Sequence, residues 1–256
     1  MTAPPLSCAV ADPDPVAWSA ARTHVGVVRA LNEDAYLDHG QVGLWAVADG
    51  MGGHQAGDVA SRVTIEALAA ISAAASGYAL LGAVRDALQQ TNHRLLAEAR
   101  SIGRGAVVGS TVVAMLIRDG HFACLWAGDS RAYRWRERRL EHVTHDHSVT
   151  QEMVDRGELT AEEARSHPQA NLITRALGIA ESLEPELSHG AIEPGDLFLL
   201  CSDGLTGAIT DAEIAELLAA HAPDAAADAL LARALEHGAK DNVTLVLVQP
   251  RAWQES

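Results

Sequence analysis

The chain has 256 residues, of which 48% are hydrophobic and 21% charged, a composition typical of a soluble globular protein with a sizeable core. It has 19 lysines and arginines against 34 aspartates and glutamates, and the resulting formal charge of −15 disfavours nucleic acids and anionic membranes as partners. No apolar run reaches the ~18 residues of a membrane span, and the N-terminus lacks the basic start and apolar stretch of a secretory signal.

The three cysteines are Cys8, Cys124 and Cys201, which lie far apart and form no C-x-x-C pair. An odd and sparse set argues against a disulfide framework and favours a reducing compartment. We therefore predict a cytoplasmic protein. Cys124 and Cys201 lie in apolar runs, so we expect them to fill the core rather than to act as nucleophiles.

Residues 1–17 are rich in proline and aspartate, and we predict a flexible lead-in there, followed by one domain over residues 18–250. Short runs with β-branched or aromatic residues predict strands over residues 42–48, 111–117, 121–127, 197–201 and 243–248. Apolar residues at helical spacing predict helices over residues 55–75, 78–100, 211–221 and 223–237. Because strict strand–helix alternation is missing, this order favours antiparallel sheets with helices packed outside.

The segment over residues 142–177 differs from its surroundings. It is polar and contains glycine and proline, which predicts short helices and loops that lie over a surface. Its histidines at positions 142, 145 and 147 are spaced poorly for a zinc site. We expect these histidines to be hydrogen-bonded or solvated.

Acidic residues recur where predicted strands end. Asp49, Asp129 and Asp203 each follow an apolar run, which would fix a carboxylate on a rigid element at the edge of the core. Arg29 and His54 lie in neighbouring polar segments. The five segments that carry these residue types are VRALNED, ADGMGGHQAGD, AGDSRAY, CSDGLTG and KDNVT.

Those residue types match the demands of phosphate ester hydrolysis, which is very slow without a catalyst. Two divalent ions about 3.5–4 Å apart clamp the attacking and leaving oxygens and activate a water. Mg²⁺ and Mn²⁺ prefer carboxylate and carbonyl oxygens as ligands. An arginine holds phosphate through a two-pronged fork, and a histidine is well suited to protonate the leaving oxygen.

Each segment alone has an ordinary explanation. An Asp-Gly pair, such as Asp49 with Gly50, usually marks a turn. Arg29 alone would be a solvated surface residue, and His54 alone would be a loop histidine. Asp241 would belong to a turn before a strand. The five segments together are much more specific than any one of them.

In this order, the segments RALNED, ADGMGGHQAGD, GSTVVAMLI, AGDSRAY, THDHS, ITRALG, LLCSDGLTG and AKDNVTLVLV resemble the PPM family, the type 2C metal-dependent Ser/Thr protein phosphatases, in its compact bacterial form. The resemblance covers nearly the whole chain, from about residue 23 to residue 248. It implies an α+β fold in which two antiparallel sheets form a central β-sandwich flanked by helices on both sides, a four-layer αββα arrangement. The metals would lie in a cleft at one edge of the sandwich.

The resemblance also implies a ligand set for two Mn²⁺ or Mg²⁺ ions. Asp49 would bridge both ions, and the Gly50 carbonyl would bind one of them. Asp203 and Asp241 would hold the other ion. Glu33 would reach the ion on the Gly50 side through a water.

Four further roles follow from the same resemblance. Asp34 would orient metal-bound water, Arg29 would bind the phosphate, and His54 would be the general acid. Asp129, together with the Asp203 position, would complete a weaker third metal site. A water or hydroxide that bridges the metals would attack phosphorus in line, without a phosphoenzyme.

The family likeness implies phosphorylated proteins as substrates and a cognate Ser/Thr kinase as a partner. Residues 142–177 correspond to the mobile flap of the family, and we expect this flap to influence substrate choice. We expect a monomer. The sequence leaves open the physiological substrate, the preference between Mn²⁺ and Mg²⁺, and activity on phosphotyrosine.

Two alternatives remain open from the sequence. A non-catalytic relative would bind phosphoproteins without cleaving them, although the metal carboxylates and Arg29 that such a protein would be expected to lack are all present. A different dinuclear phosphohydrolase, such as a phosphodiesterase or nuclease, is disfavoured by the charge of −15.

Overall fold

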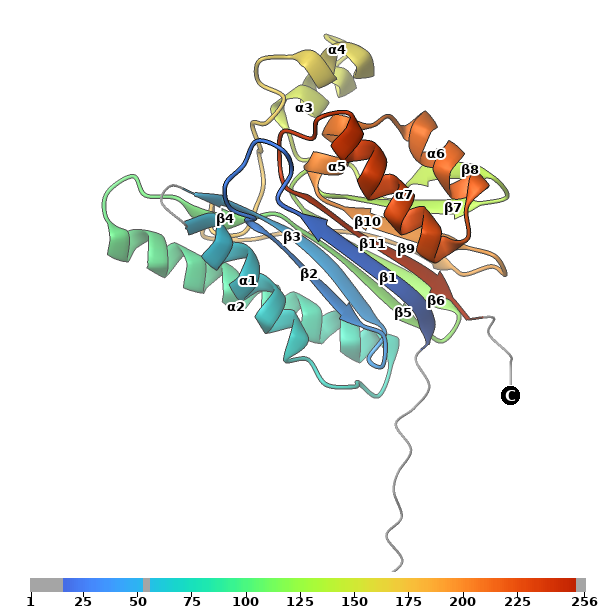
Figure 1. Cartoon of the computed structure of the whole chain (residues 1–256). Helices are drawn as coiled ribbons and strands as arrows, with labels where there is room; N and C mark the ends of the chain where they lie inside the picture. The colour runs from blue at the N-terminus through green and yellow to red at the C-terminus, as the bar shows by residue number, and fades with distance from the viewer. Residues whose placement is uncertain (1–15, 53–55, 252–256) are drawn as a thin grey trace, which may run out of the picture.

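Two antiparallel sheets form the centre of the computed structural model, which describes residues 16–52 and 56–251 (Figure 1). The first sheet has the strand order β1 (Ala17–His24), β11 (Val243–Pro250), β10 (Leu197–Cys201), β7 (Arg131–Arg136) and β8 (Arg139–His142). The second has the order β2 (Asp34–His39), β3 (Leu44–Gly52), β5 (Val112–Arg118), β6 (His121–Ala127) and β9 (Glu186–Ala191), and β4 (Val108–Ser110) pairs with β3.

The central strands are apolar on both faces because both faces are covered. Along β5, the side chains of Val113 and Met115 lie between the two sheets, whereas those of Val112 and Ala114 belong to the core beneath the helices. Successive residues of a strand point to opposite faces. A strand buried on both sides therefore reads as a continuous apolar run, which is the pattern that the sequence shows.

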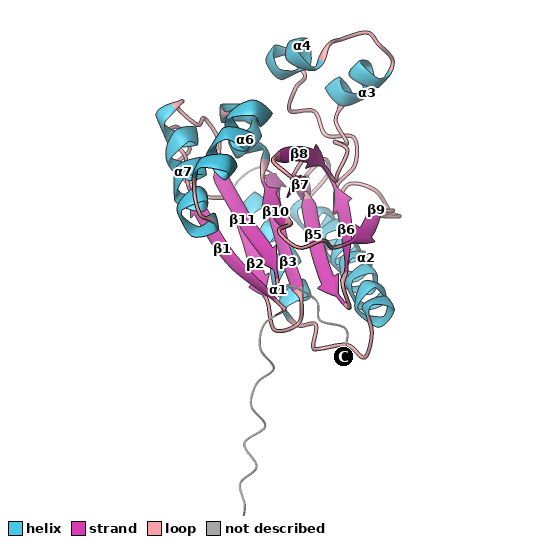
Figure 2. Ribbon diagram, turned by 90° about the vertical axis from the view of Figure 1, so that its right-hand side faces the viewer, coloured by secondary structure: helices cyan, strands magenta, loops and turns pink. Residues whose placement is uncertain are grey.

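Helices cover the outer face of each sheet (Figures 1 and 2). The helices α1 (Ala56–Ala69) and α2 (Gly77–Ile102) pack on the second sheet, and α5 (Asp203–Ala208), α6 (Asp211–Ala220) and α7 (Pro223–Glu236) pack on the first. The predicted α+β sandwich with helices on both sides is therefore confirmed. None of the helices in the described ranges combines the length and the mean hydropathy of a membrane span.

Local signals fix where several helices begin. The Ser76 side chain accepts a hydrogen bond from the Ala79 amide at the start of α2. At the start of α6, Thr210 and Glu213 form a reciprocal capping box, and α7 begins at Pro223. The predicted helix over residues 55–75 was too long, because α1 ends at Ala69.

The segment between β8 and β9 stands at one end of the sandwich (Figure 2). It contains the short helices α3 (Val149–Asp155) and α4 (Ala161–Ser166), as the polar sequence predicts. An isolated bridge pairs Ser148 with Ile173 within the segment, and another pairs Ser110 with Leu177 near its end. We call residues 142–177 the flap; its mobility stays a prediction.

The predicted N-terminal lead-in over residues 1–17 lies almost entirely outside the described residues. Strand β1 begins at Ala17, one residue before the predicted start of the domain. The single domain over residues 18–250 and its lead-in stay predictions.

Candidate metal centre

Antiparallel pairing brings the acidic segments to one edge of the sandwich. Asp34 opens β2 and lies directly opposite Asp49 near the end of β3. Asp129 follows the end of β6, and Asp203 follows the end of β10. Asp241 precedes β11, which runs antiparallel to β10. Because neighbouring strands run in opposite directions, the start of one strand meets the end of the next at the same edge.

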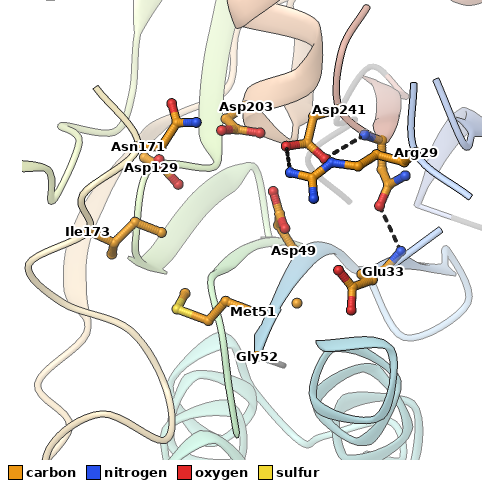
Figure 3. A pocket seen from close by; sticks show the side chains of 12 residues that line it. Arg29, Glu33, Asp49, Met51, Gly52, Asp129, Asn171, Ile173, Asp203 and Asp241 are labelled. Atoms are coloured by element: carbon orange, nitrogen blue, oxygen red, sulfur yellow. Dashed lines mark hydrogen bonds and ion pairs between the residues drawn. The ribbon is translucent and has the colours of Figure 1, made fainter. Parts of the chain in front are cut away.

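A cavity of about 240 Å³ opens at this edge. Its lining contains seven of the residues that the sequence analysis singled out, namely Arg29, Glu33, Asp49, Gly50, Asp129, Asp203 and Asp241. Figure 3 shows the carboxylates of Asp49, Asp203 and Asp241 and the guanidinium of Arg29 around the same space. Asp34 does not line this cavity. His54 lies outside the described residues.

Close backbone packing places Glu33 beside Gly50. A Cβ atom on Gly57, at the start of α1, would lie 2.5 Å from Glu33 Oε1 and 2.8 Å from the Gly50 carbonyl oxygen. These two oxygens therefore converge on one point. Gly50 itself has no room for a side chain, because a Cβ there would lie 2.0 Å from the Gly57 carbonyl oxygen.

Asp49 is held by its backbone, and its carboxylate faces the cavity beside that of Asp203. Its amide donates to the Thr111 hydroxyl at 3.0 Å, and its carbonyl accepts from the Thr111 amide at 2.8 Å. The Thr111 hydroxyl is itself 2.7 Å from that of Ser130. Both residues lie within the motif segments GSTVVAMLI and AGDSRAY, but the pairing of their hydroxyls was not predicted from the sequence.

Asn242 fixes the loop that carries Arg29 and Glu33. Its side-chain oxygen accepts from the Glu33 amide at 2.7 Å, and its side-chain nitrogen donates to the carbonyls of Val25 and Leu31 at 2.9 Å each. In the sequence this asparagine appears only as part of the segment KDNVT, with no role predicted for it. Its place directly after Asp241 is the signal that would have identified it.

The Arg29 side chain lies over the cavity and donates to Asp241 Oδ2 at 2.6 Å. The hydrogen bond and the charge of Asp241 raise the pKa of Arg29 above its ordinary value. Half of the Arg29 side chain remains exposed. A guanidinium in this position has further N–H groups that can donate hydrogen bonds to an anion in the cavity.

Asp34, which lies opposite Asp49 on the neighbouring strand, accepts a 2.7 Å hydrogen bond from the Ser202 hydroxyl. Burial, followed by the nearby charges of Asp203 and Asp241, raises the pKa of Asp34 to about 7 against the opposing effect of its hydrogen bonds. The other carboxylate oxygen of Asp34, Oδ1, is buried without a hydrogen-bond partner.

Burial and mutual repulsion act on the other carboxylates in the same way. Burial and the charge of Asp241 raise the pKa of Asp203 to about 6. The pKa values of Asp49 and Asp129 lie well above the ordinary value, through burial first and then through neighbouring carboxylates. Oδ1 of Asp129 and Oδ1 of Asp203 are buried without hydrogen-bond partners.

Among the described residues, Asp241 is the one carboxylate of this cluster that forms an ion pair with a cationic side chain. Buried carboxylates are stable when they are paired or bind a metal, and an oxygen-only donor set suits Mg²⁺ and Mn²⁺. The residues present therefore fit divalent cations. Among the described residues, no three acidic, histidine or cysteine side chains are already arranged as a complete ligand set. Arg29 occupies one oxygen of Asp241. The fit of the cluster to divalent cations therefore depends on its oxygen ligands and on the carboxylate oxygens without partners, not on a coordination geometry that is already formed.

The three flap histidines do not form a metal site of their own. Nε2 of His142 is 2.7 Å from Asp211 Oδ2, and Nε2 of His145 is 2.8 Å from Asp155 Oδ2. His147 accepts a hydrogen bond from the Gly128 amide at 3.1 Å. The expectation that these histidines are hydrogen-bonded is confirmed.

Two stacked antiparallel sheets with helices on both outer faces are the fold of the protein phosphatase catalytic domains that this structure resembles. The family model for protein phosphatase 2C matches residues 24–245. The chain therefore belongs to the protein phosphatase 2C family, as the sequence motifs indicate.

Three comparisons with two relatives illustrate the similarity. The Serine/threonine protein phosphatase PstP of Mycobacterium tuberculosis is 40% identical over 228 residues, which are 89% of this chain and 44% of that protein. The chain thus spans less than half of the length of PstP. The structure of PppA, described as a key regulatory component of T6SS in Pseudomonas aeruginosa, has a TM-score of 0.85 and 44% identity and covers 92% of this chain and 98% of that one. The PstP catalytic domain in complex with two manganese ions has a TM-score of 0.83 and 37% identity, with coverages of 92% and 99%.

Proposed function

We propose that this chain is a metal-dependent protein phosphatase that hydrolyses phosphoserine and phosphothreonine in proteins. The observation that carries the proposal is the group of buried, partnerless carboxylate oxygens beside Arg29 at one sheet edge. The family and the manganese-bound PstP relative support it.

We assign the metal ligands from the same residues. Asp49, with the Gly50 carbonyl and Glu33, would serve one ion, and Asp49 with Asp203 and Asp241 would serve the other. The convergence of Glu33 Oε1 with the Gly50 carbonyl oxygen supports the first group. Mn²⁺ and Mg²⁺ both suit these oxygens. When bound, the two ions would supply positive charge for the phosphoryl oxygens and a water of lowered pKa.

The side chains around the ions have separate tasks. Arg29 would bind the phosphoryl oxygens through donors that Asp241 does not use. Asp34, held by Ser202, would accept a proton or hydrogen bond from the attacking water. His54 is proposed as the general acid on its sequence context alone, since it lies outside the described residues.

Asp129 is proposed as part of a third, weaker metal site together with Asp203. Its side chain is buried, with one oxygen that lacks a partner, and the charge of Asp203 is a main cause of its raised pKa. Figure 3 places the two carboxylates on the same side of the cavity. Removal of Asp129 would then weaken the binding of the third ion and leave the two-ion site in place.

The substrates that we propose are phosphorylated proteins, among them a cognate Ser/Thr kinase, and we propose a monomer that acts in the cytoplasm. The free, buried thiols of Cys124 and Cys201 suit a reducing compartment. Nucleic acids are not proposed as partners, given the charge of −15.

The test is the release of phosphate from phosphothreonine peptides during titration with Mn²⁺ and Mg²⁺. We expect turnover that depends on metal, that a chelator abolishes, and that Asp203→Ala or Asp241→Ala removes. Binding of phosphopeptides without turnover would instead support a non-catalytic relative. Cleavage of a cyclic nucleotide but not of phosphopeptides would support a different dinuclear hydrolase.

A further inference from the structure

A second cavity, of about 410 Å³, lies between the flap and the body of the protein, and we call it the flap cavity. The flap helices contribute Gln151, Val154 and Arg165, and α5 contributes Thr206 and Gly207. Asp129, Asn171 and Asp203 line both this cavity and the metal cavity. The two spaces therefore adjoin each other.

Most charged groups of the flap cavity already have partners within the protein. Asp146 accepts from Arg131 through both of its oxygens, at 2.7 to 3.0 Å. Asp211 accepts from the Tyr133 hydroxyl at 3.0 Å and contacts His142 at 2.7 Å. Arg131 and Asp146 neutralise each other, and both oxygens of Asp211 already have partners, so these groups offer little to a ligand.

The remaining histidine and acids of the cavity are accounted for as well. His145 contacts Asp155 at 2.8 Å. Asp129 and Asp203 belong to the metal centre described above. No charged group considered so far is available to an anionic ligand.

Arg165 is different. Its exposed side chain extends from α4 and donates to the backbone carbonyl of Ile209 at 3.1 Å, which closes one side of the flap cavity against the end of α5. Within the described ranges it forms no ion pair. A guanidinium has five N–H donors, so most of the hydrogen-bonding capacity of Arg165, and its full charge, remain available.

The cavity also has free space near this arginine. A Cβ atom added to Gly207 would meet nothing within 4 Å. Gly207 lies two residues before Ile209, the residue that Arg165 contacts. There is thus room on this side of α5 for part of a ligand.

We propose that the flap cavity receives the stretch of polypeptide that flanks the phosphorylated residue, and that Arg165 selects an acidic side chain in that stretch. This inference rests on the proposed phosphatase function. A protein substrate with its phosphate in the metal cavity must continue away from it, and the shared wall of Asp129, Asn171 and Asp203 gives one direct route. Arg165 lies on that route without a counter-ion, so its positive charge favours a carboxylate in the substrate.

The test uses phosphothreonine peptides that carry Glu, Gln or Lys at one position at a time, from three residues before the phosphothreonine to three residues after it. Exposed ion pairs are worth about 0.2–1 kcal/mol, so the native protein should favour Glu over Lys by about 1.4- to 5-fold in kcat/KM at one or more positions. Raising the salt concentration should reduce that ratio. Arg165→Gln should bring it close to one, and Arg165→Glu should invert it.

The Glu-to-Lys ratio within each variant is the decisive quantity, because it is unaffected by a general loss of activity. Arg165→Gln keeps an N–H donor for the Ile209 carbonyl but removes the charge. Arg94→Glu, on the exposed surface of α2, makes the same charge reversal away from the cavity and should leave the ratio at its native value.

Two results would overturn the inference. One is a native protein that hydrolyses Glu and Lys peptides equally well. The other is an Arg165→Gln protein that loses activity on all peptides in the same proportion, which would limit Arg165 to holding the flap. Failure of the native protein to hydrolyse any phosphopeptide in Mn²⁺ would instead refute the proposed function.

Discussion

Arg29 and Asp241 are 212 residues apart in sequence, and their side chains meet through a 2.6 Å hydrogen bond over the candidate metal centre. The contact joins the loop after β1 to the residue pair that precedes β11. The same carboxylate is proposed to bind a cation, and the same guanidinium is proposed to bind phosphate. The pair therefore shows how closely the two proposed sites adjoin.

Replacement of Arg29 by alanine should chiefly weaken the engagement of phosphate. Hydrogen bonds to charged groups contribute about 1.5–3 kcal/mol, so kcat/KM for a phosphothreonine peptide should fall about 10- to 100-fold. Arg29→Lys should recover only part of this loss, because an ammonium lacks the two-pronged fork. Steady-state kinetics at saturating Mn²⁺ measures both effects.

Arg22→Ala is the matched control for Arg29→Ala. Arg22 pairs with Asp224 and Asp228 at the β1–α7 contact, so its loss should leave the kinetics unchanged. Native kinetics in the Arg29→Ala protein would contradict the proposed role of Arg29.

The carboxylate cluster predicts an unusual effect of Asp203→Asn on stability. At pH 7 the raised pKa of Asp203, about 6, means that burial and Asp241 disfavour its charged form. Without divalent ions, the asparagine variant should therefore melt at a higher temperature than the native protein, by an amount equivalent to about 1–3 kcal/mol. With Mn²⁺ the order should reverse, because ligand binding stabilises the native protein.

Thermal unfolding in a chelator and in millimolar Mn²⁺ provides this measurement. Asp86→Asn, an exposed change on α2, should show neither effect. A chelated Asp203→Asn protein that melts below the native protein would show that the carboxylate is stabilised by other contacts.

Asp211 predicts a stability change at low pH away from the metal centre. Burial alone would raise the pKa of Asp211, but the contacts with His142 and Tyr133 and the charge of Arg131 bring it below its ordinary value. Its charged form therefore stabilises the fold above the unfolded-state pKa of about 4, and this contribution disappears as the pH falls through the lower folded-state value.

Urea unfolding of native and Asp211→Asn protein from pH 7 to pH 3 tests this prediction. The native protein should be more stable by about 0.3–1 kcal/mol at pH 7, since the pair is partly exposed. The difference should shrink towards pH 3. A difference that grows as the pH falls would have the wrong sign for a lowered pKa.

Continuous apolar runs made some strands predictable to the residue. Strands β6 (His121–Ala127) and β10 (Leu197–Cys201) begin and end where the sequence predicts, because their neighbours are turns and polar residues. Strand β7 (Arg131–Arg136) was not predicted. Its sequence RAYRWR carries three arginines, whose charges are met by acids elsewhere in the chain, as when Arg136 pairs with Asp196.

At the candidate site, the sequence predicted which residue types occur but not how they pair. The positions of Asp49 and Asp203 after apolar runs predicted their place at the sheet edge, and the structure places both there. The short helix α5, which begins at Asp203, was missed because its Asp-Gly start resembles a turn. The contact of Arg165 with Ile209 joins the flap to α5 and depends on tertiary packing that local sequence patterns do not encode.

Two glycines of α5 predict opposite effects of the same substitution. A Cβ on Gly204 would lie 1.9 Å from the backbone carbonyl oxygen of Asn242, which cannot move without disturbing the turn before β11. Gly204→Ala should therefore lower the free energy of unfolding by more than about 2 kcal/mol. A Cβ on Gly207 meets nothing within 4 Å, so Gly207→Ala should be neutral or stabilising by up to about 1 kcal/mol, through the higher helix propensity of alanine.

Urea unfolding of the two alanine variants in a chelator separates packing from metal binding. Because Gly204 lies between Asp203 and the Asn242 backbone, Gly204→Ala should also displace the Asp203 carboxylate. The variant should then gain less thermal stability from Mn²⁺ than Gly207→Ala does, since stabilisation by a ligand follows its affinity for the folded state. Equal stabilities of the two variants would mean that α5 moves away from β11 without cost, which the close backbone contact at Gly204 argues against.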